Sequence, residues 1–389
     1  MVKVREWTAH QVRIRLKKPI RHASHTRTET DNLVVRCVLE DGTVGFGEGV
    51  PREYVTGESI DSALQLLGQA HLGRQLDLAQ DFAHALEKAE SFTLPAQTGD
   101  LRGIRGNAAR CAVELAWLDA CGRHFHKPIS EVTALLAPDC HEERLEVRYS
   151  GVITSARGWK LKVSAGLQRL YGLKHIKVKV GIPGQDDVRR LRAVRAWAGP
   201  TMNLRIDANE AWSPQEAAAR IQELEAFGIT SVEQPLAQEN DQALPALRRA
   251  IHTPVMLDES LCGMEDGKRA IAEGWCDLFN VRISKCGGFI PSLRLVQLAK
   301  KHGLQCQLGC QVGETAILSA AGRHFASSVS GLRYLEGSYD RRLVRDALGK
   351  TDITFGTGGR APALLGGGLG LEFDEEALRR ASVQHIPLN

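Results

Sequence analysis

The feature that most constrains the fold is a regular alternation, from residue 145 to residue 337, of short apolar runs and stretches with helical spacing. Each run has the length and the branched apolar residues of a buried strand, and the stretch that follows it is long enough for one helix. The runs recur about every 25 residues, as strand–helix units do. They are LEVRYSGVI (145–153), HIKVKV (175–180), NLRIDAN (203–209), SVEQP (231–235), VMLDES (255–260), LFNVRISK (278–285), LQCQLG (304–309) and LRYLEG (332–337).

Strands that are joined through helices lie parallel, because each crossover returns the chain to the same end of the sheet. Eight such units are the number that closes a (β/α)-type barrel. The alternative is an open doubly wound sheet, which expects a glycine-rich phosphate turn after an early strand, and the sequence has none there. The tail TFGTGGRAPALLGGGLGLEFDEEAL is glycine-rich, but it neither follows a barrel strand nor opens a clear helix, so we interpret it as an irregular segment.

The first part of the chain has another pattern. EWTAHQVRIRL alternates with period two, and NLVVRCVLEDGTVGFGEG predicts two strands around the Asp41-Gly42 turn. Helical spacing follows at 58–71, 76–90 and 103–124. We therefore expect three parts: a small α+β domain over 1–130, a barrel domain over 131–340, and a C-terminal segment over 341–389 that returns to the small domain.

Composition excludes several classes of function. The formal charge of +4 is spread without a long basic run and only 5% of the residues are aromatic, which argues against a nucleic-acid partner. No apolar run approaches the ~20 residues that a membrane span needs. The nine cysteines form no C-x-x-C pair, and the start MVKVREWTAH lacks the apolar core of a signal peptide, so we expect reduced thiols and a cytoplasmic protein.

Charged residues stand at the expected carboxyl ends of five consecutive strands, where a barrel carries its active site. Three carboxylates that converge raise one another's pKa unless a cation lies between them, and all-oxygen ligation suits Mg²⁺. A single acid at a strand end is more often a helix cap, and a lone Lys-x-Lys is usually a solvated strand edge, but neither explains the whole set. The set is Lys177 and Lys179, Asp207 with Asn209 beyond it, Glu233, Asp258, and Lys285.

Lys177 and Lys179 lie two residues apart and therefore share one side of their strand. Neighbouring positive charge lowers the pKa of an amine, so Lys177 and a metal ion would prepare Lys179 to act as a base. A metal-bound carboxylate loses its α-proton more readily, and the metal and Lys177 would hold the resulting enediolate. The sequence therefore predicts a metal-dependent enzyme that acts on a small-molecule carboxylate.

The ordered motifs KVK, DAN, VEQP, LDES and SKCGG resemble those of the enolase superfamily and, within it, the muconate lactonizing enzyme subgroup. The resemblance spans nearly the whole chain. It implies a modified TIM barrel, (β/α)₇β, with an N-terminal α+β capping domain, and one Mg²⁺ per subunit. It further implies that Asp207, Glu233 and Asp258 are metal ligands, that Lys179 and Lys285 are acid–base groups on opposite faces of the substrate, and that Lys177 assists electrostatically.

The resemblance also suggests where the substrate is recognised, because selectivity in the subgroup is set by the capping-domain loops and the last barrel strands. Dipeptide epimerases typically show Asp-x-Asp at the last strand, where this chain has Ser338-Tyr339-Asp340, so only one acid matches and the dipeptide prediction is weakened. It is not removed, because Glu336 and Asp340 would still meet a substrate ammonium. The expected substrate contacts are Arg27, Tyr54, Asn209, Glu314, Glu336 and Asp340.

Two lysines on opposite faces favour a racemase or epimerase of an N-acyl amino acid or dipeptide, because inversion needs a proton carrier on each face. A muconate-type cycloisomerase and an o-succinylbenzoate synthase-like dehydratase are the alternatives, since they use the same residues. A non-catalytic barrel would be expected to have lost at least one of these residues. A Schiff-base aldolase would not need three carboxylates. We also expect the chain to form a homo-oligomer.

Overall fold

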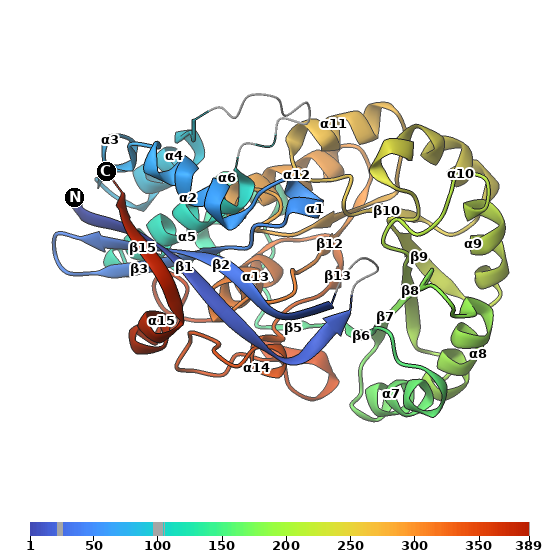
Figure 1. The fold of residues 1–389 in the computed structure, drawn as a ribbon. Coiled ribbons are helices and arrows are strands. Elements are labelled where there is room, and N and C mark those ends of the chain that lie inside the picture. The colour runs from blue at the N-terminus through green and yellow to red at the C-terminus, as the bar shows by residue number, and fades with distance from the viewer. Residues whose placement is uncertain (22–25, 96–103, 105, 389) are drawn as a thin grey trace.

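The computed structural model describes residues 1–21, 26–95, 104 and 106–388. Its centre is a sheet of eight parallel strands in the order β13-β12-β11-β10-β9-β8-β7-β6 (Figure 1). The N–H of Ser150, just before the first strand, donates to the C=O of Leu335 at the end of the last, at 2.8 Å, so the two ends of the sheet meet. The strands are β6 (Gly151–Ile153), β7 (His175–Lys179), β8 (Asn203–Asp207), β9 (Ile229–Glu233), β10 (Val255–Leu257), β11 (Leu278–Val281), β12 (Gln305–Leu308) and β13 (Leu332–Leu335).

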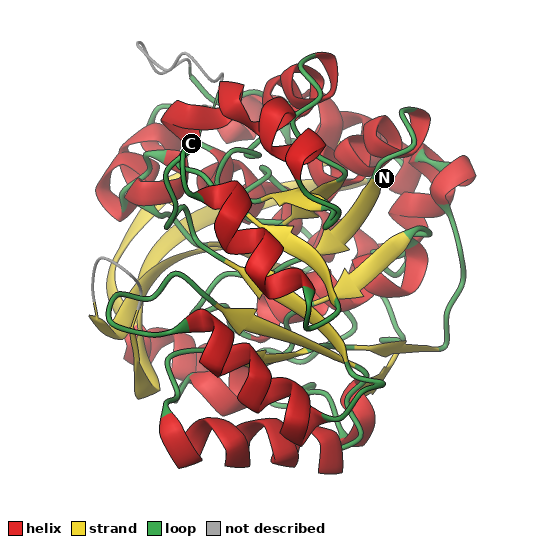
Figure 2. Cartoon of the chain, turned by 90° about the vertical axis from the view of Figure 1, so that its right-hand side faces the viewer, coloured by secondary structure: helices red, strands yellow, loops and turns green. Residues whose placement is uncertain are grey.

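A helix follows each of the first seven strands and covers the outside of the sheet, so the expected (β/α)₇β barrel with a capping domain is confirmed (Figure 2). Amphipathic helices must bury their apolar faces, and here they do so against the strands. No helix within the described ranges is long and apolar enough to span a membrane. The barrel helices are α7 (Gly158–Leu170), α8 (Asp187–Ala198), α9 (Ala217–Glu225), α10 (Leu244–Ala250), α11 (Met264–Ala272), α12 (Phe289–Lys301) and α13 (Ala316–Ser328).

Two strands differ most from the expected ranges. The run 145–153 is divided, because β5 (Glu146–Arg148) pairs antiparallel with β14 (Arg360–Pro362) outside the barrel and only β6 joins the barrel. The run 278–285 forms a strand only to Val281, and residues 283–287 are a turn. Lys285 therefore lies four residues beyond the end of β11 and not at the end of the strand.

The N-terminal part is an antiparallel sheet built from β1 (Val2–Arg21), β2 (Thr26–Leu39) and β3 (Val44–Gly49). Near the other end of the chain, β15 (Ser382–Leu388) pairs with β1, so both ends of the chain belong to this sheet. The other elements of the chain are α1 (Glu53–Thr56), α2 (Ile60–Gly68), α3 (Leu72–Gln75), β4 (Leu78–Ala79), α4 (Phe82–Ser91), α5 (Asn107–His124), α6 (Glu131–Leu136), α14 (Asp340–Leu343) and α15 (Glu375–Ala381), with short 3₁₀ turns at Pro138–Cys140, Gln238–Ala243 and Thr357–Gly359.

Helix α5 lies directly on β3 because small residues line both surfaces. A Cβ atom on Gly47 would lie 1.9 Å from the carbonyl oxygen of Ala112, and Gly45 and Gly49 meet the same helix just as closely. This approach buries α5 between the sheet and the barrel loops. At its start, the Asn107 amide donates to the carbonyl oxygens of Cys262 and Lys285, both at 2.7 Å. The helix thereby ties the N-terminal sheet to two loops at the carboxyl end of the barrel.

Candidate active site

The strand register brings the expected charged residues to one level at the carboxyl end of the barrel. Lys179 is paired with Asp207 across β7 and β8, and Asp207 with Glu233 across β8 and β9. Asp258 directly follows β10, two residues beyond the partner of Glu233. The three carboxylate side chains are at most 1% exposed. Parallel strands that end in acids therefore collect buried negative charge at the mouth of the barrel.

Lys177 is the shared cation of three acids. Its Nζ lies 3.1 Å from both carboxylate oxygens of Glu233, 2.8 Å from Glu336 Oε2 and 3.3 Å from Asp207 Oδ2. Burial alone would lower the pKa of Lys177, but the negative charges of Glu233, Glu336 and Asp207 outweigh burial and hold that pKa well above its ordinary value. Lys177 is thus a permanent positive charge at neutral pH.

Lys179 is more accessible than Lys177. Its side chain is 24% exposed, and its Nζ lies 2.9 Å from Asp207 Oδ2 and also donates to Asn209 Oδ1. Asn209 adopts a left-handed backbone conformation with φ of 43°, and its N–H donates to Asp207 Oδ1 at 3.0 Å. The loop after β8 therefore folds back to orient both the acid and the amine. Lys179 is held beside Asp207 at the opening of the barrel.

Asp258 is bound from two sides. Its Oδ2 accepts from Arg282 and its Oδ1 accepts from Lys285 Nζ at 2.9 Å. Lys285 also donates to the carbonyl oxygens of Asp258 at 2.6 Å and Asn280 at 3.0 Å, and its side chain is 0% exposed. The structure differs here from the expectation that Lys285 faces a substrate, because its three N–H donors all end on protein oxygens. Sequence inspection also missed Arg282, which stands directly after β11.

The three acids fit a hard divalent cation by their chemistry, since all the donor atoms are oxygens on neighbouring strands. Burial, and then the negative charge of Asp207, raise the pKa of Glu233 to about 7, as expected for acids that crowd together in a buried site. Among the described residues, no group of three His, Cys, Asp or Glu side chains is already arranged to hold a metal ion. Instead, basic side chains pair with the carboxylate oxygens: Lys177 pairs with Glu233, and Arg282 pairs with Asp258.

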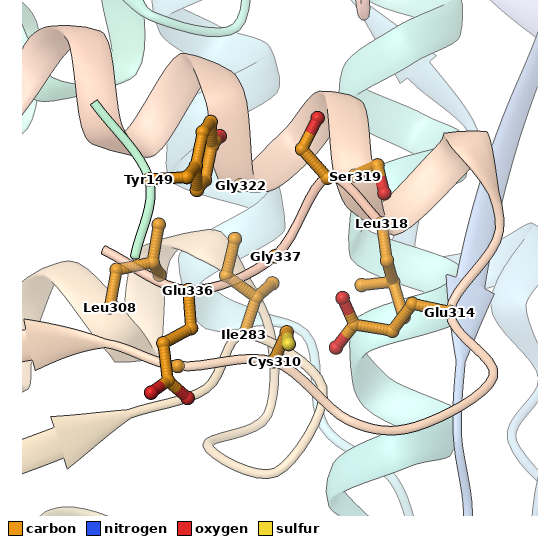
Figure 3. Close-up of a pocket in the computed structure, with 12 residues that line it drawn as sticks. Tyr149, Ile283, Leu308, Cys310, Glu314, Leu318, Ser319, Gly322, Glu336 and Gly337 are labelled. Atoms are coloured by element: carbon orange, nitrogen blue, oxygen red, sulfur yellow. The ribbon is translucent and has the colours of Figure 1, made fainter. Parts of the chain in front are cut away.

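Four of the six expected substrate contacts fall into two places, and Asn209 lies beside Lys179. Glu314 and Glu336 line a small cavity of about 10 Å³ on either side of Cys310 (Figure 3). The second place lies in the N-terminal part, where the Arg27 guanidinium is 5.3 Å from the centre of the Tyr54 ring. Asp340 is not among the residues that line the cavity, but burial raises its pKa and a hydrogen bond with Ser319, which does line the cavity, lowers it.

Glu336 is already neutralised by protein cations. In addition to Lys177, it accepts from Arg205 Nη2 at 3.0 Å, and Arg205 also donates to Gln307. Burial would raise the pKa of Glu336, but Lys177 and Arg205 lower it by more, so the acid is ionised and paired. Sequence inspection missed Arg205 because an arginine within an apolar strand gives no sign of which acid it will meet across the barrel.

The N-terminal sheet holds the loop after β12, which carries Glu314. Asn32 on β2 donates to Gly313 O at 2.8 Å and to Glu48 Oε1 at 2.6 Å. Glu48 on β3 in turn accepts from the N–H of Thr315 at 3.0 Å and that of Leu318 at 3.1 Å, at the start of α13. Sequence inspection missed this contact. The available signal was a charged residue between glycines in an apolar strand, GFGEG.

Replacing Glu48 by glutamine should change how stability depends on pH. Burial raises the pKa of Glu48 from 4.5 to about 7. Between these two pH values Glu48 is ionised in the unfolded chain but protonated in the folded chain. The free energy of unfolding of wild type therefore falls as pH rises. The stability of the variant relative to wild type should therefore rise by about 3 kcal/mol from about pH 4.5 to about pH 8, measured by urea unfolding.

Glu87→Gln on the exposed face of α4 is the matched control for this charge change. Its stability relative to wild type should be the same at both pH values. The assignment of a buried, proton-binding Glu48 would be wrong if the stability difference between Glu48→Gln and wild type were also the same at both pH values.

Comparison with protein-family models gives two matches that together cover most of the chain. The model described as "Mandelate racemase / muconate lactonizing enzyme, N-terminal domain" matches residues 4–133. The model described as "Enolase C-terminal domain-like" matches residues 162–377. The first match corresponds to the part of the chain with the antiparallel sheet, and the second corresponds to the barrel.

The chain aligns with named relatives over most of the length of both proteins. The chain is 30% identical over 321 residues to an L-Ala-D/L-Glu epimerase of Clostridium acetobutylicum, which covers 80% of this chain and 83% of the relative. It is 26% identical over 383 residues to an N-succinyl-L-Arg/Lys racemase of Bacillus cereus, with 96% of each chain covered. It is 28% identical over 366 residues to muconate cycloisomerase 1 of Acinetobacter baylyi, with 92% and 94% covered.

Solved structures agree with the fold over the full length. The crystal structure of the N-succinyl Arg/Lys racemase from Bacillus cereus superposes with a TM-score of 0.85 at 24% identity and covers 100% of both chains. A dipeptide epimerase from Cytophaga hutchinsonii, complexed with Mg and the dipeptide D-Ala-L-Val, superposes with a TM-score of 0.84 at 25% identity and also covers 100% of both chains.

Proposed function

Because the chain belongs to the enolase superfamily and, within it, to the muconate lactonizing enzyme subgroup, we propose that it is an isomerase that removes the α-proton of a small-molecule carboxylate with the help of Mg²⁺. Membership in this superfamily makes the chain an enzyme. The observation that carries the proposal is Lys179, a partly exposed amine held at the barrel mouth beside Asp207. The α-proton would pass to this amine once the amine has lost its own proton.

Asp207, Glu233 and Asp258 would hold the Mg²⁺, since they are buried, all-oxygen and on neighbouring strands. Bound Mg²⁺ would polarise the substrate carboxylate and so acidify the α-proton. Lys177 would remain charged throughout and would hold negative charge that develops on the substrate carboxylate. Asn209 would keep Lys179 and Asp207 in their relative positions, because it hydrogen-bonds to both.

The pairing of the acids favours an N-acylated substrate over one with a free ammonium group. Glu336, the acid at the last strand, is neutralised by Lys177 and Arg205. Burial raises the pKa of Glu314 to about 8, so that acid is uncharged at pH 7. Arg282 adds positive charge at the carboxyl end of β11. An acyl group, which is neutral or carries its own carboxylate, suits this environment better than a cation does.

Racemisation or epimerisation of an N-acyl amino acid or dipeptide is the outcome that the named relatives favour. Cycloisomerisation, as in the muconate relative, or a dehydration of the o-succinylbenzoate synthase type, is the other candidate. Both include a proton transfer between Lys179 and the α-carbon, which runs from the substrate to Lys179 in racemisation or dehydration and from Lys179 to the substrate when muconate closes to a lactone, so they share the test below. We also propose the division into a capping domain (1–130), a barrel domain (131–340) and a returning segment (341–389), and a homo-oligomeric assembly.

The test is α-proton exchange in D₂O. The enzyme, with Mg²⁺, is incubated with a panel of N-acetyl and N-succinyl amino acids, dipeptides and muconate, and ¹H NMR follows loss of the α-proton signal or consumption of muconate. We expect at least one compound to react, EDTA to stop the reaction and excess Mg²⁺ to restore it. Reaction that continues in EDTA would remove the metal from the proposal, and a panel without any reaction would contradict the proposal itself.

A further inference from the structure

We infer that Arg282, and not Lys285, is the side chain that faces Lys179 across the barrel mouth, so that the enzyme moves protons on one face of its substrate only. The inference rests on the proposed function and narrows its outcome. A site with one proton-carrying face cannot invert an α-carbon directly. It can return the proton to the face from which it came, or deliver it to a leaving oxygen on the neighbouring carbon.

The strand order places Arg282 and Lys179 on opposite walls. Lys179 ends β7, which is the second strand in the order from β6 to β13, and Arg282 directly follows β11, which is the sixth. Four steps separate the two strands in a ring of eight, and that is the largest separation possible. Residues at the carboxyl ends of these two strands therefore approach a bound substrate from opposite sides.

Lys285 does not reach this space. An ammonium group has three N–H donors, and those of Lys285 end on Asp258 O, Asp258 Oδ1 and Asn280 O. Its own carbonyl oxygen accepts from the amide of Asn107 on α5. Lys285 thus lies within the wall between two barrel loops, where it fixes the backbone around Asp258. Delivering a proton to a substrate would require it to break all three hydrogen bonds in a fully buried place.

Arg282 lies where the charged groups of the barrel converge. Its Nη2 contacts Asp258 and lies 3.6 Å from Glu233 Oε1, and its side chain is 13% exposed. Burial is the largest influence on the pKa of the surrounding acids and thiol, and the Arg282 charge lowers the pKa of five of these groups: Asp207, Glu259, Cys310, Glu314 and Glu336. By contrast, the charge of Lys285 acts on Asp258 and on the neighbouring Cys286.

Arg282 also has a donor that the protein does not use. Its Nε is buried and, among the residues that the structure describes, has no hydrogen-bond partner. A buried donor without a partner costs about 1–3 kcal/mol, so such a group is expected to meet a ligand or water. A guanidinium presents its N–H groups as a planar fork that suits two carboxylate oxygens. Arg282 is therefore suited to hold an anionic oxygen of the substrate opposite Lys179.

The chemistry follows from what each group can do. Arginine keeps its proton in proteins, so Arg282 binds and stabilises but does not act as a base. The substrate C–H bond breaks, its proton passes to the Lys179 amine, and its electron pair moves into a double bond to the carboxylate carbon. When the pair then forms the α,β double bond, the β C–O bond breaks. In ring opening of a lactone the departing oxygen leaves as a carboxylate and the Lys179 ammonium gives its proton to solvent, whereas in a dehydration the departing hydroxyl takes that proton and leaves as water.

The test compares the stereochemistry of wild type with that of Arg282→Lys, using the compound of the panel that exchanges fastest. In D₂O, wild type should place deuterium at the α-carbon of one enantiomer, read by ¹H NMR, without forming the other enantiomer, read by chiral chromatography. Arg282→Lys puts a titratable amine on the second face and should make inversion appear. The proposal would be overturned by a wild type that inverts its substrate and loses inversion in Lys285→Arg, or by an Arg282→Lys variant without inversion.

A second measurement tests the position of Lys285 independently of the proposed function. Full-length protein is treated briefly with acetic anhydride, and the modified lysines are located by mass spectrometry. Lys179 should be acetylated at least about 10-fold faster than Lys285, because burial protects the latter. Equal rates would refute the placement of Lys285 even if no substrate were found, whereas the expected rates together with an unreactive panel would refute only the proposed function.

Discussion

Replacing Lys179 by methionine should lower the rate of α-proton exchange by about 10³-fold, because a positioned general base contributes 10²–10⁴-fold to such a step. The fold should survive the change, since the side chain is partly exposed and its partner Asp207 keeps Lys177 at 3.3 Å. The measurement is the initial rate of α-deuteration, with the urea unfolding midpoint measured in parallel to show that the variant is folded.

Lys179→Arg is the informative control for this prediction. It keeps a positive charge that can pair with Asp207 but removes the amine that would act as a base, because arginine keeps its proton in proteins. Exchange should be as slow in this variant as in Lys179→Met if Lys179 acts as a base. Exchange near the wild-type rate in Lys179→Arg would show that the charge alone matters, and another base would then have to be found.

The fold was predictable because the barrel repeats one physical rule along the chain. Each strand is buried on both faces and therefore appears as a continuous apolar run, and each helix follows at a regular distance. Runs such as HIKVKV and NLRIDAN gave strands within a residue or two of the observed β7 and β8. The division of 145–153 was not predictable, because β5 pairs with a strand that comes more than two hundred residues later.

The acids of the site were predictable for a related reason, since parallel strands end at one edge and the residue type at each end is visible in the sequence. Arg282 was not, because the segment Arg282-Ile283-Ser284-Lys285 has the alternation of a strand and no glycine or proline before Gly287. The structure ends β11 at Val281, so Arg282 rather than Lys285 takes the place at the mouth. A strand end that comes four residues earlier than expected thus changes the chemistry that we infer for the site.

Replacing Lys177 by methionine should destabilise the metal-free protein by about 3–5 kcal/mol at neutral pH, the usual cost of leaving buried charge without its partner. Lys177 is the cation shared by Asp207, Glu233 and Glu336, and its removal leaves these acids to repel one another in a buried site. The acids would respond by binding protons more readily than in wild type. The loss of stability should therefore be largest at high pH and should shrink as pH falls.

Urea unfolding in EDTA at about pH 8 and about pH 5.5 measures this dependence. Burial and the charge of Asp207 already raise the pKa of Glu233 to about 7 in wild type, so at the lower pH this acid carries a proton and no longer needs Lys177. Lys174→Met, an exposed change three residues earlier, is the matched control and should stay within about 0.5 kcal/mol of wild type at both pH values. An equal loss for Lys177→Met at both pH values would show that packing, and not charge, is what Lys177 supplies. A loss that grows with pH would instead establish that one buried ammonium keeps three acids ionised and close together, which is the arrangement that a divalent cation at this site would require.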